Sequence, residues 1–205
     1  MRCLISAVLI LVLLKVSGCR EEKFVPDPND PRLPKYTERG NEVAGALISD
    51  MAWKTNFKTF FDAPPGYAFY IYNYPNKDSL IVMILGTIND GKNKGMPIDI
   101  FIGIKGAGVK VYRELKNLKN KIFTIDGKTN YSTLEDRAMI LGGKTESVKN
   151  GIGTFYFVNV QQPKNDDRYI ISGTFDFHFQ TLSGQVDVQK GRFDFTVSGY
   201  QYYTN

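Results

Sequence analysis

The chain has 205 residues with 26 Lys or Arg and 21 Asp or Glu, for a formal net charge of +5 at pH 7. This charge is modest and scattered, so no basic face of the kind that binds nucleic acid is expected. The chain has one histidine and two cysteines, Cys3 and Cys19, which leaves little material for a metal site or a disulfide framework.

The first 18 residues have the layout of a secretory signal. Arg2 supplies a short positive region, and an apolar run from Leu4 to Leu14 follows it. That run is too short to span a bilayer comfortably. Val16-Ser-Gly-Cys19 resembles the bacterial lipobox, in which the cysteine receives a diacylglyceryl group and becomes the first residue after cleavage. The alternatives are an ordinary signal peptide with an incidental cysteine, or an uncleaved anchor.

The lipobox interpretation predicts a signal peptide over residues 1–18 and a lipid on Cys19. Two or three acyl chains anchor a protein stably, because each buried methylene contributes about 0.8 kcal/mol. Cys3 lies in the removed segment, so the mature chain has one cysteine and no intramolecular disulfide. Removing Arg2 and Lys15 from the formal +5 leaves +3. We expect an outer-membrane protein, lipid-anchored on the periplasmic or the cell-surface side.

A Pro-rich, flexible tether is expected over residues 19–38, followed by one domain over residues 39–205. The tether holds four prolines separated by charged residues, Pro26, Pro28, Pro31 and Pro34. Such a stretch buries too little apolar surface to offset its ordering entropy, and prolines favour extended spacing. Glu21-Glu22 resembles the acidic tract that marks surface export in some Bacteroidetes lipoproteins, although Arg20 departs from it.

The domain is predicted to be β throughout. Short β-branched and aromatic runs alternate with Gly, Asn, Asp and Pro, and no long helical period is visible. The spacing favours a single antiparallel β-sandwich, with a lipocalin-like β-barrel as the alternative. Residues 109–120 allow at most a short helix. The ten expected strands are Val43–Ile48, Tyr67–Asn73, Ser79–Thr87, Ile98–Ile104, Lys121–Ile125, Arg137–Ile140, Gly153–Val160, Tyr169–Phe179, Gly184–Gln189 and Arg192–Val197.

The C-terminal strands show the clearest alternation. Phe175, Phe177 and Phe179 share one face of their strand, with polar side chains between them. Phe193 and Phe195 repeat this pattern between Arg192, Asp194 and Thr196. Alternation of this kind is typical of antiparallel strands that are apolar on the core side and polar on the other side.

Several of these features together resemble a family of small Bacteroidetes lipoproteins of unknown function. They are the lipobox, the Pro-rich tail, Leu33-Pro-x-x-Thr-x-x-Gly-Asn41, Trp53, and two C-terminal Gly-x-Phe-x-Phe strands from Gly173 and Gly191. Family members often have Asn-Gly in the first hairpin, where this chain has Ser49-Asp50. The resemblance implies a compact β domain at the cell envelope, and it implies no activity and no catalytic residues.

Signatures of catalysis are sparse. A Ser-His-Asp arrangement would have to use His178, with Asp176 or Asp194 as its carboxylate, and an exposed strand histidine is the simpler interpretation. The glycines around Lys105 and Lys144 lack the spacing of a phosphate-binding loop and are better explained as turns. We expect no cofactor, no metal site and no catalytic residues.

Tyrosines are in notable excess in two short segments. Tyr70, Tyr72 and Tyr74 fall in one, with Tyr67 just before them, and Tyr200, Tyr202 and Tyr203 crowd the C-terminus. Aromatic faces stack on sugar rings, and tyrosine serves many recognition surfaces. The predicted ligand-binding candidates are Tyr70, Tyr72, Tyr74, Tyr200 and Tyr202, with core packing and edge decoration as the alternative explanation.

Three hypotheses for the function follow. The first is a non-enzymatic binding or interaction module that engages a glycan or an envelope protein, and it is favoured because catalytic signatures are lacking. The second is an envelope hydrolase whose carboxylates converge only in the fold. The third is a structural or pilus-like envelope component, which would need a pairable edge strand.

Overall fold

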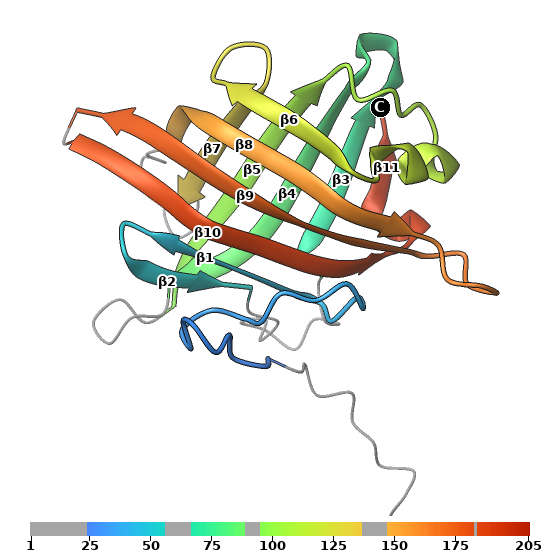
Figure 1. Ribbon diagram of the computed structural model, residues 1–205. Coiled ribbons are helices and arrows are strands. Elements are labelled where there is room, and N and C mark those ends of the chain that lie inside the picture. The colour runs from blue at the N-terminus through green and yellow to red at the C-terminus, as the bar shows by residue number, and fades with distance from the viewer. Residues whose placement is uncertain (1–23, 56–66, 89–94, 137–146, 183) are drawn as a thin grey trace, which may run out of the picture.

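The computed structural model describes residues 24–55, 67–88, 95–136, 147–182 and 184–205, and it is nearly all β (Figure 1). Within the described residues, the 3₁₀ segments η1 (Pro75–Lys77), η2 (Tyr112–Leu118) and η4 (Gly199–Gln201) accompany the strands. The strands are β1 (Val43–Ile48), β2 (Met51–Lys54), β3 (Phe69–Tyr74), β4 (Ser79–Ile88), β5 (Met96–Lys105), β6 (Lys121–Asp126), β7 (Tyr131–Asp136), β8 (Ser147–Gln161), β9 (Tyr169–Thr181), β10 (Gly184–Val197) and β11 (Tyr202–Thr204).

Eight strands close into an antiparallel barrel in the order β4-β2-β1-β10-β9-β8-β7-β5, with β5 returning to β4. Strand β3 pairs with the part of β4 that β2 leaves open, β11 adds to β3 in parallel, and β6 adds to β8. The all-β prediction is confirmed, and of the two architectures considered the chain adopts the barrel. Closure depends on one short contact, in which Trp53 and Lys54 of β2 pair with Ile88 and Thr87 of β4.

The strands differ from the expected ones in a few places. The two C-terminal runs expected between residues 184 and 197 form the single strand β10, with a bulge between Val188 and Gly191. The short strands β2, β7 and β11 were not expected, and the expected strand Arg137–Ile140 lies outside the described residues. In the β1–β2 hairpin, Ser49 and Asp50 both have positive φ, 47° and 66°, as a type I′ turn requires.

Aromatic side chains fill the interior of the barrel. Phe175, Phe177 and Phe179 are at most 1% exposed, as their alternation predicts. The ring of Phe193 lies 5.2 Å from that of Phe155 and 5.6 Å from that of Phe69, both stacked. Rings packed in this way contribute about 0.5–1.5 kcal/mol per pair beyond the area they bury.

Trp53 secures the point where the barrel closes. Its indole Nε1 donates a buried hydrogen bond of 2.7 Å to the carbonyl oxygen of Ile98 on β5. The flat ring lies directly over Gly86 of β4, where a Cβ atom would come within 2.4 Å of it. A side chain at position 86 would therefore displace the tryptophan, because close-packed interiors leave no room for extra atoms.

The segment 109–120 contains the short helix that the sequence allowed. Leu115 and Leu118 of η2 are fully buried. The hydroxyl of Tyr112 donates to the carbonyl oxygen of Val197 at 2.7 Å, at the end of β10. Helix η2 therefore covers one end of the barrel and is hydrogen-bonded to the end of β10.

Residues 24–42 form a segment that we call the N-terminal strap, which runs along the outside of β1 and β10 (Figure 1). Leu33 is fully buried, and Pro34 packs so closely on Gly45 that a Cβ atom there would lie 2.3 Å from the proline ring. The side chain of Arg192 pairs with that of Asp27. The expectation of a flexible tether up to residue 38 is therefore wrong for residues 24–38, which belong to the folded body.

The strap is held most extensively by one buried carboxylate, that of Asp194, which is 2% exposed. It accepts a hydrogen bond from the hydroxyl of Thr37 and three from the backbone amides of Arg39 (3.1 Å), Gly40 (2.8 Å) and Asn41 (3.2 Å). The polar outward face that the alternation predicts for β10 is present, but the strap covers it. Because the carboxylate accepts these four hydrogen bonds, it can stay buried.

We expect Asp194→Ala to lower the free energy of unfolding by about 3 kcal/mol, because four donors lose a charged acceptor in a buried place. Urea unfolding of residues 24–205 measures the change. Asp187→Ala is the control: this carboxylate lies at the surface beside His178, and its loss should lower the free energy of unfolding far less. Equal destabilisation by the two substitutions would contradict the central role of Asp194.

Candidate functional site

The tyrosines of β3 lie on the outer face of the barrel. Phe69 and Ile71 point into the core and are fully buried, whereas Tyr70, Tyr72 and Tyr74 alternate with them and are half-buried. Three of the five predicted ligand-binding tyrosines therefore share one outward face, because side chains along a strand point alternately to its two sides.

A cluster of four rings, which we call the tyrosine surface, consists of Tyr67, Tyr70, Tyr72 and Tyr203. Tyr72 stacks on Tyr203 of the neighbouring strand β11, with ring centroids 5.1 Å apart and planes at 16°. Tyr70 lies 6.2 Å from Tyr203 and meets Tyr67 edge to face at 6.4 Å. Tyr67 and Tyr203 are 43% and 42% exposed, so the cluster is open to solvent.

The stacking determines which part of each ring a ligand can reach. The Tyr72 and Tyr203 centroids are separated by about one strand spacing, ~4.8 Å, and their planes are nearly parallel. These two rings therefore stand upright on the sheet, with faces toward each other and edges and hydroxyl groups outward. Burial, and then the neighbouring phenols, raises the pKa of Tyr70 and Tyr72, so these hydroxyls are neutral donors and acceptors at physiological pH.

Apolar side chains continue this face across the adjoining strands. Tyr72 is opposite Ile81 of β4, and Tyr70 is opposite Met83, which in turn is opposite Phe101 of β5. These three apolar residues are half-buried. The tyrosine surface therefore has an apolar floor beside it, and this part of the barrel lacks the polar exterior that an antiparallel strand commonly presents.

The other predicted tyrosines are placed differently. Tyr74 lies at the end of β3, with the ammonium group of Lys77 5.8 Å from its ring. Tyr200 is 82% exposed in η4. Tyr202 points to the core side, where its ring meets that of Tyr112 at 5.6 Å. Sequence reasoning thus selected Tyr202 where the structure brings Tyr203 to the cluster, and the pairing of β11 with β3 decides which of the two faces outward.

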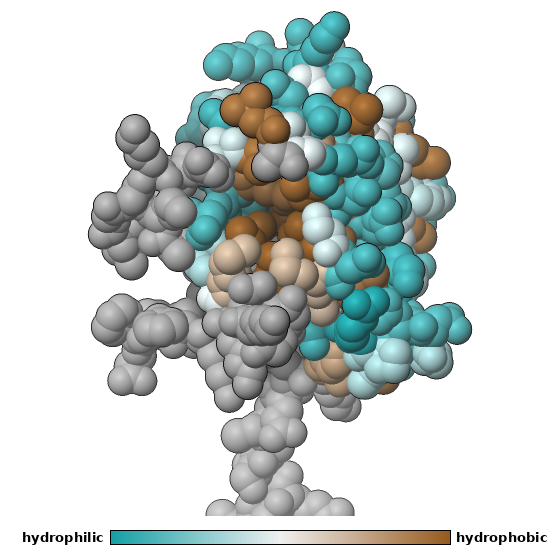
Figure 2. Space-filling view, turned by 90° about the vertical axis from the view of Figure 1, so that its left-hand side faces the viewer, coloured by the Kyte–Doolittle hydropathy of each residue, from teal (hydrophilic) through white to brown (hydrophobic). Residues whose placement is uncertain are grey.

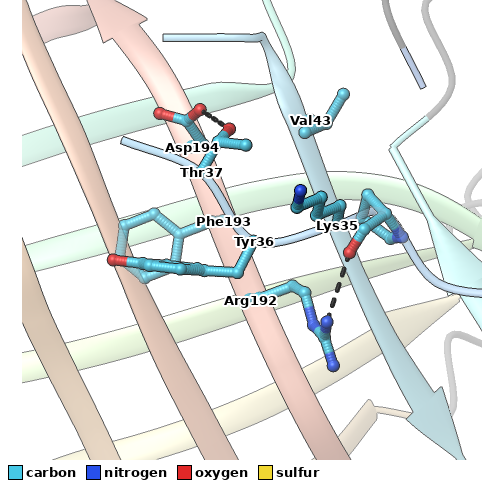
Figure 3. Close-up of a pocket in the computed structure, with 8 residues that line it drawn as sticks. Lys35, Tyr36, Thr37, Val43, Arg192, Phe193 and Asp194 are labelled. Atoms are coloured by element: carbon cyan, nitrogen blue, oxygen red, sulfur yellow. Dashed lines mark hydrogen bonds between the residues drawn. The ribbon is translucent and has the colours of Figure 1, made fainter. Parts of the chain in front are cut away.

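A narrow crevice with no room for a water molecule lies between the strap and β10 (Figure 3). Its polar groups are engaged by the strap itself: Arg192 donates to the carbonyl oxygen of Pro34 at 3.3 Å, and Asp194 accepts from Thr37. Burial raises the pKa of Tyr36, which lies across β10 at this seam, to about 12. We interpret the crevice as the seam of the docked strap.

The structure gives His178 a different partner from those considered. Its Nδ1 lies 2.7 Å from a carboxylate oxygen of Asp187, on the neighbouring strand β10. Asp194 is paired with Ser172, which precedes His178 by six residues along β9, about 20 Å away at strand rise, and its carboxylate is hydrogen-bonded to the strap. Asp176 accepts a hydrogen bond from the backbone amide of Lys190. His178 and Asp187 therefore form a surface pair.

The end of the barrel that carries the β9–β10 hairpin has hydrophobic side chains at its centre. Met51, Met96, Val148 and Val186 lie at or near the starts of their strands and are partly buried against the core. Figure 2 faces this side and shows hydrophobic residues in the middle, with hydrophilic residues to the right of them. The apolar core therefore extends to this end of the molecule.

Comparison with protein-family models, with curated proteins and with solved structures finds no match to this chain. Among the residues that the structure describes, no helix is long and apolar enough to cross a membrane. The same residues hold no group of three or more His, Cys, Asp or Glu side chains placed to bind a metal ion. The tyrosine surface, with its stacked and solvent-open rings, is the candidate functional site.

The inward placement of Tyr202 makes a prediction about pH. Burial raises the pKa of its hydroxyl to about 12, from about 10 in an unfolded chain. Its contribution to stability is therefore complete below about pH 10 and is lost as the pH rises toward 12. We expect Tyr202→Phe to lose less of its free energy of unfolding than the wild type over this interval. Urea unfolding at a series of alkaline pH values measures this, and identical pH dependence would contradict it.

Proposed function

We propose that this chain is a lipid-anchored, extracytoplasmic binding module of the outer membrane, without enzymatic activity, whose tyrosine surface recognises a glycan. The observation that carries the proposal is the solvent-open cluster of Tyr67, Tyr70, Tyr72 and Tyr203 beside an apolar floor. The combination of phenol hydroxyls, ring edges and apolar atoms suits a neutral ligand that has both hydroxyl groups and C–H faces, as sugars do.

The geometry favours a shallow contact along the surface. Cross-strand neighbours fix the upright rings of Tyr72 and Tyr203, so their hydroxyls are held in place before a ligand arrives. Rigid aromatic side chains lose little conformational entropy on binding, which is why they serve recognition surfaces well. An extended glycan laid across β11 and β3 would exchange hydrogen bonds with the phenols and place its C–H faces over Ile81 and Met83.

A second candidate, assembly with an envelope protein, is favoured by the position of β11. This strand is at the end of the sheet order and pairs with β3 on one side. An edge strand can accept a further strand through its backbone groups. Binding through the edge of β11 would depend on backbone hydrogen bonds, whereas glycan binding depends on the tyrosine side chains, so side-chain substitutions distinguish the two.

The proposed anchor rests on the sequence of residues 1–19. The short apolar run and the lipobox-like Val16-Ser-Gly-Cys19 support export and lipidation. The resemblance to small Bacteroidetes lipoproteins supports the same envelope location. The proposed anchor fits either the periplasmic or the cell-surface side of the outer membrane.

Replacement of Cys19 should abolish anchoring. We expect Cys19→Ala to incorporate no labelled fatty acid and to leave the membrane fraction or to stay uncleaved, because the thiol that carries the lipid is gone. Metabolic labelling with a fatty acid and cell fractionation measure this, with Cys3→Ala as the matched control that keeps both label and membrane association. A Cys19→Ala chain of mature size retained in the membrane fraction would contradict the proposed anchor.

Removal of one ring should weaken glycan recognition. We expect Tyr72→Ala to weaken glycan binding at least tenfold, because Tyr72 is central to the cluster and supports Tyr203. A glycan-array screen of residues 24–205 identifies the ligand, and calorimetry on that ligand gives the affinity.

The control for that experiment is Tyr200→Ala, which removes an exposed tyrosine outside the cluster and should leave the affinity unchanged. A screen without any binding glycan, or equal loss from Tyr72→Ala and Tyr200→Ala, would refute the proposed glycan surface and favour assembly through β11.

A further inference from the structure

The docked strap limits how far the barrel can stand from a membrane. The backbone amide of Lys35 donates to the carbonyl oxygen of Val25 at 2.6 Å, and Pro26 bridges to Pro34. With Asp27 paired to Arg192, the chain is fixed to the barrel from residue 25 onward. Residues that the sequence assigned to a spacer are therefore used to cover β1 and β10.

The remaining distance is short. Phe24 follows Cys19 by five residues, and a fully extended chain spans at most about 3.3–3.6 Å per residue, or roughly 17 Å in all. A diacylglyceryl group on Cys19 would place that residue at the boundary between acyl chains and headgroups. The headgroup layer itself is about 5–7 Å thick on each side of the bilayer. The side of the barrel that carries Phe24 must then lie within about 10 Å of the headgroups.

The side chains on this side have the composition of a membrane interface. Phe24 and Val25 are 37% and 48% exposed. The ammonium group of Lys54 lies 4.3 Å over the ring of Phe24, and Lys35 is exposed beside Val25. We call these four residues the juxtamembrane patch. Aromatic and aliphatic groups that enter the headgroup layer beside lysines are typical of surfaces that bind bilayers.

We infer that the juxtamembrane patch, Phe24, Val25, Lys35 and Lys54, rests on the bilayer and contacts anionic lipid headgroups. This inference depends on the proposed lipid anchor at Cys19. Lysines near an anionic surface are attracted to it, and the two apolar side chains gain area buried in the interface. Burial lowers the pKa of Lys54, and a phosphate beside it would oppose that shift.

The contact would also fix the orientation of the barrel. In Figure 1 the described chain begins at the lower edge of the molecule, whereas β6, β11 and the C-terminus lie at its upper side. A barrel resting on its strap therefore holds β11, and the part of β3 that pairs with it, away from the lipid.

The test uses the mature lipidated chain in vesicles. Because the Cys19 thiol carries the lipid, an introduced cysteine is the only free thiol and takes a single fluorophore. We compare Val25→Cys with Ile122→Cys, a position that is 63% exposed on β6, using lipids that carry a nitroxide quencher in the headgroup. The expected result is at least threefold stronger quenching at position 25, and equal quenching at the two positions overturns the inference.

Headgroup charge is tested in the same vesicles. With phosphatidylcholine containing phosphatidylglycerol, quenching at position 25 should exceed that in phosphatidylcholine alone. The double substitution Lys35→Glu with Lys54→Glu should remove this additional quenching. The matched control reverses the charge of two exposed lysines at the start of β6, Lys119→Glu with Lys121→Glu. This variant should keep the additional quenching. Equal quenching in both kinds of vesicle overturns the assignment to anionic headgroups.

Flotation of the vesicles separates this inference from the proposed function. Protein that fails to float with either kind of vesicle contradicts the lipid anchor itself. Protein that floats, but whose label at position 25 is quenched no more than that at position 122, leaves the anchor standing and refutes the juxtamembrane patch alone.

Discussion

The buried carboxylate of Asp194 determines more of this molecule than any other single group. Its hydrogen bonds to residues 37–41 attach the N-terminal strap to β10. The strap in turn covers the outward side of β1, all six residues of which are buried. A buried charge is tolerable only when its hydrogen bonds are satisfied. The strap and the outer face of β10 therefore depend on each other: without the strap the carboxylate would lose its donors.

This dependence explains why the sequence predicts a flexible tether over residues 24–38, although these residues are part of the folded body. Prolines and charges between them are the composition of a solvated linker, and Leu33 alone gives little sign of burial. The charges are instead used in pairs: Asp27 meets Arg192, and Asp30 meets Arg32 and Lys190. Arg192 and Lys190 lie more than 150 residues from their partners in the strap. These two pairs leave no periodic signal in the strap, so composition alone could not identify it as part of the fold.

Most of the strand positions, by contrast, follow from local pattern. Alternation placed the phenylalanines of β9 and β10 inward, and turn residues marked most strand ends. Closure could not be predicted in the same way, because it depends on two residue pairs between β2 and β4 and on the room that Gly86 leaves for Trp53. Strands β2 and β11 have four and three residues, too few to show a period.

For the candidate site too, local pattern predicts part of the arrangement and long-range pairing decides the rest. The period of two in β3 is enough to place Tyr70, Tyr72 and Tyr74 on one face. The same rule applied at the C-terminus says that Tyr202 and Tyr203 point to opposite sides, but not which of them faces outward. Tyr203 faces outward because it is paired with Tyr72 across the β11–β3 ladder. This contact joins residues 131 positions apart in the sequence.

The strap and the tyrosine surface use different parts of the barrel wall. The strap covers β1 and β10, whereas the tyrosines stand on β3 and β11, beyond β2 and β4 in the sheet order. A barrel filled with packed aromatic rings is stiff, since close-packed interiors deform little. A module held to lipid through its strap would therefore keep its tyrosine surface accessible and in a fixed direction. In this arrangement the proposed ligand and the bilayer do not compete for the same surface.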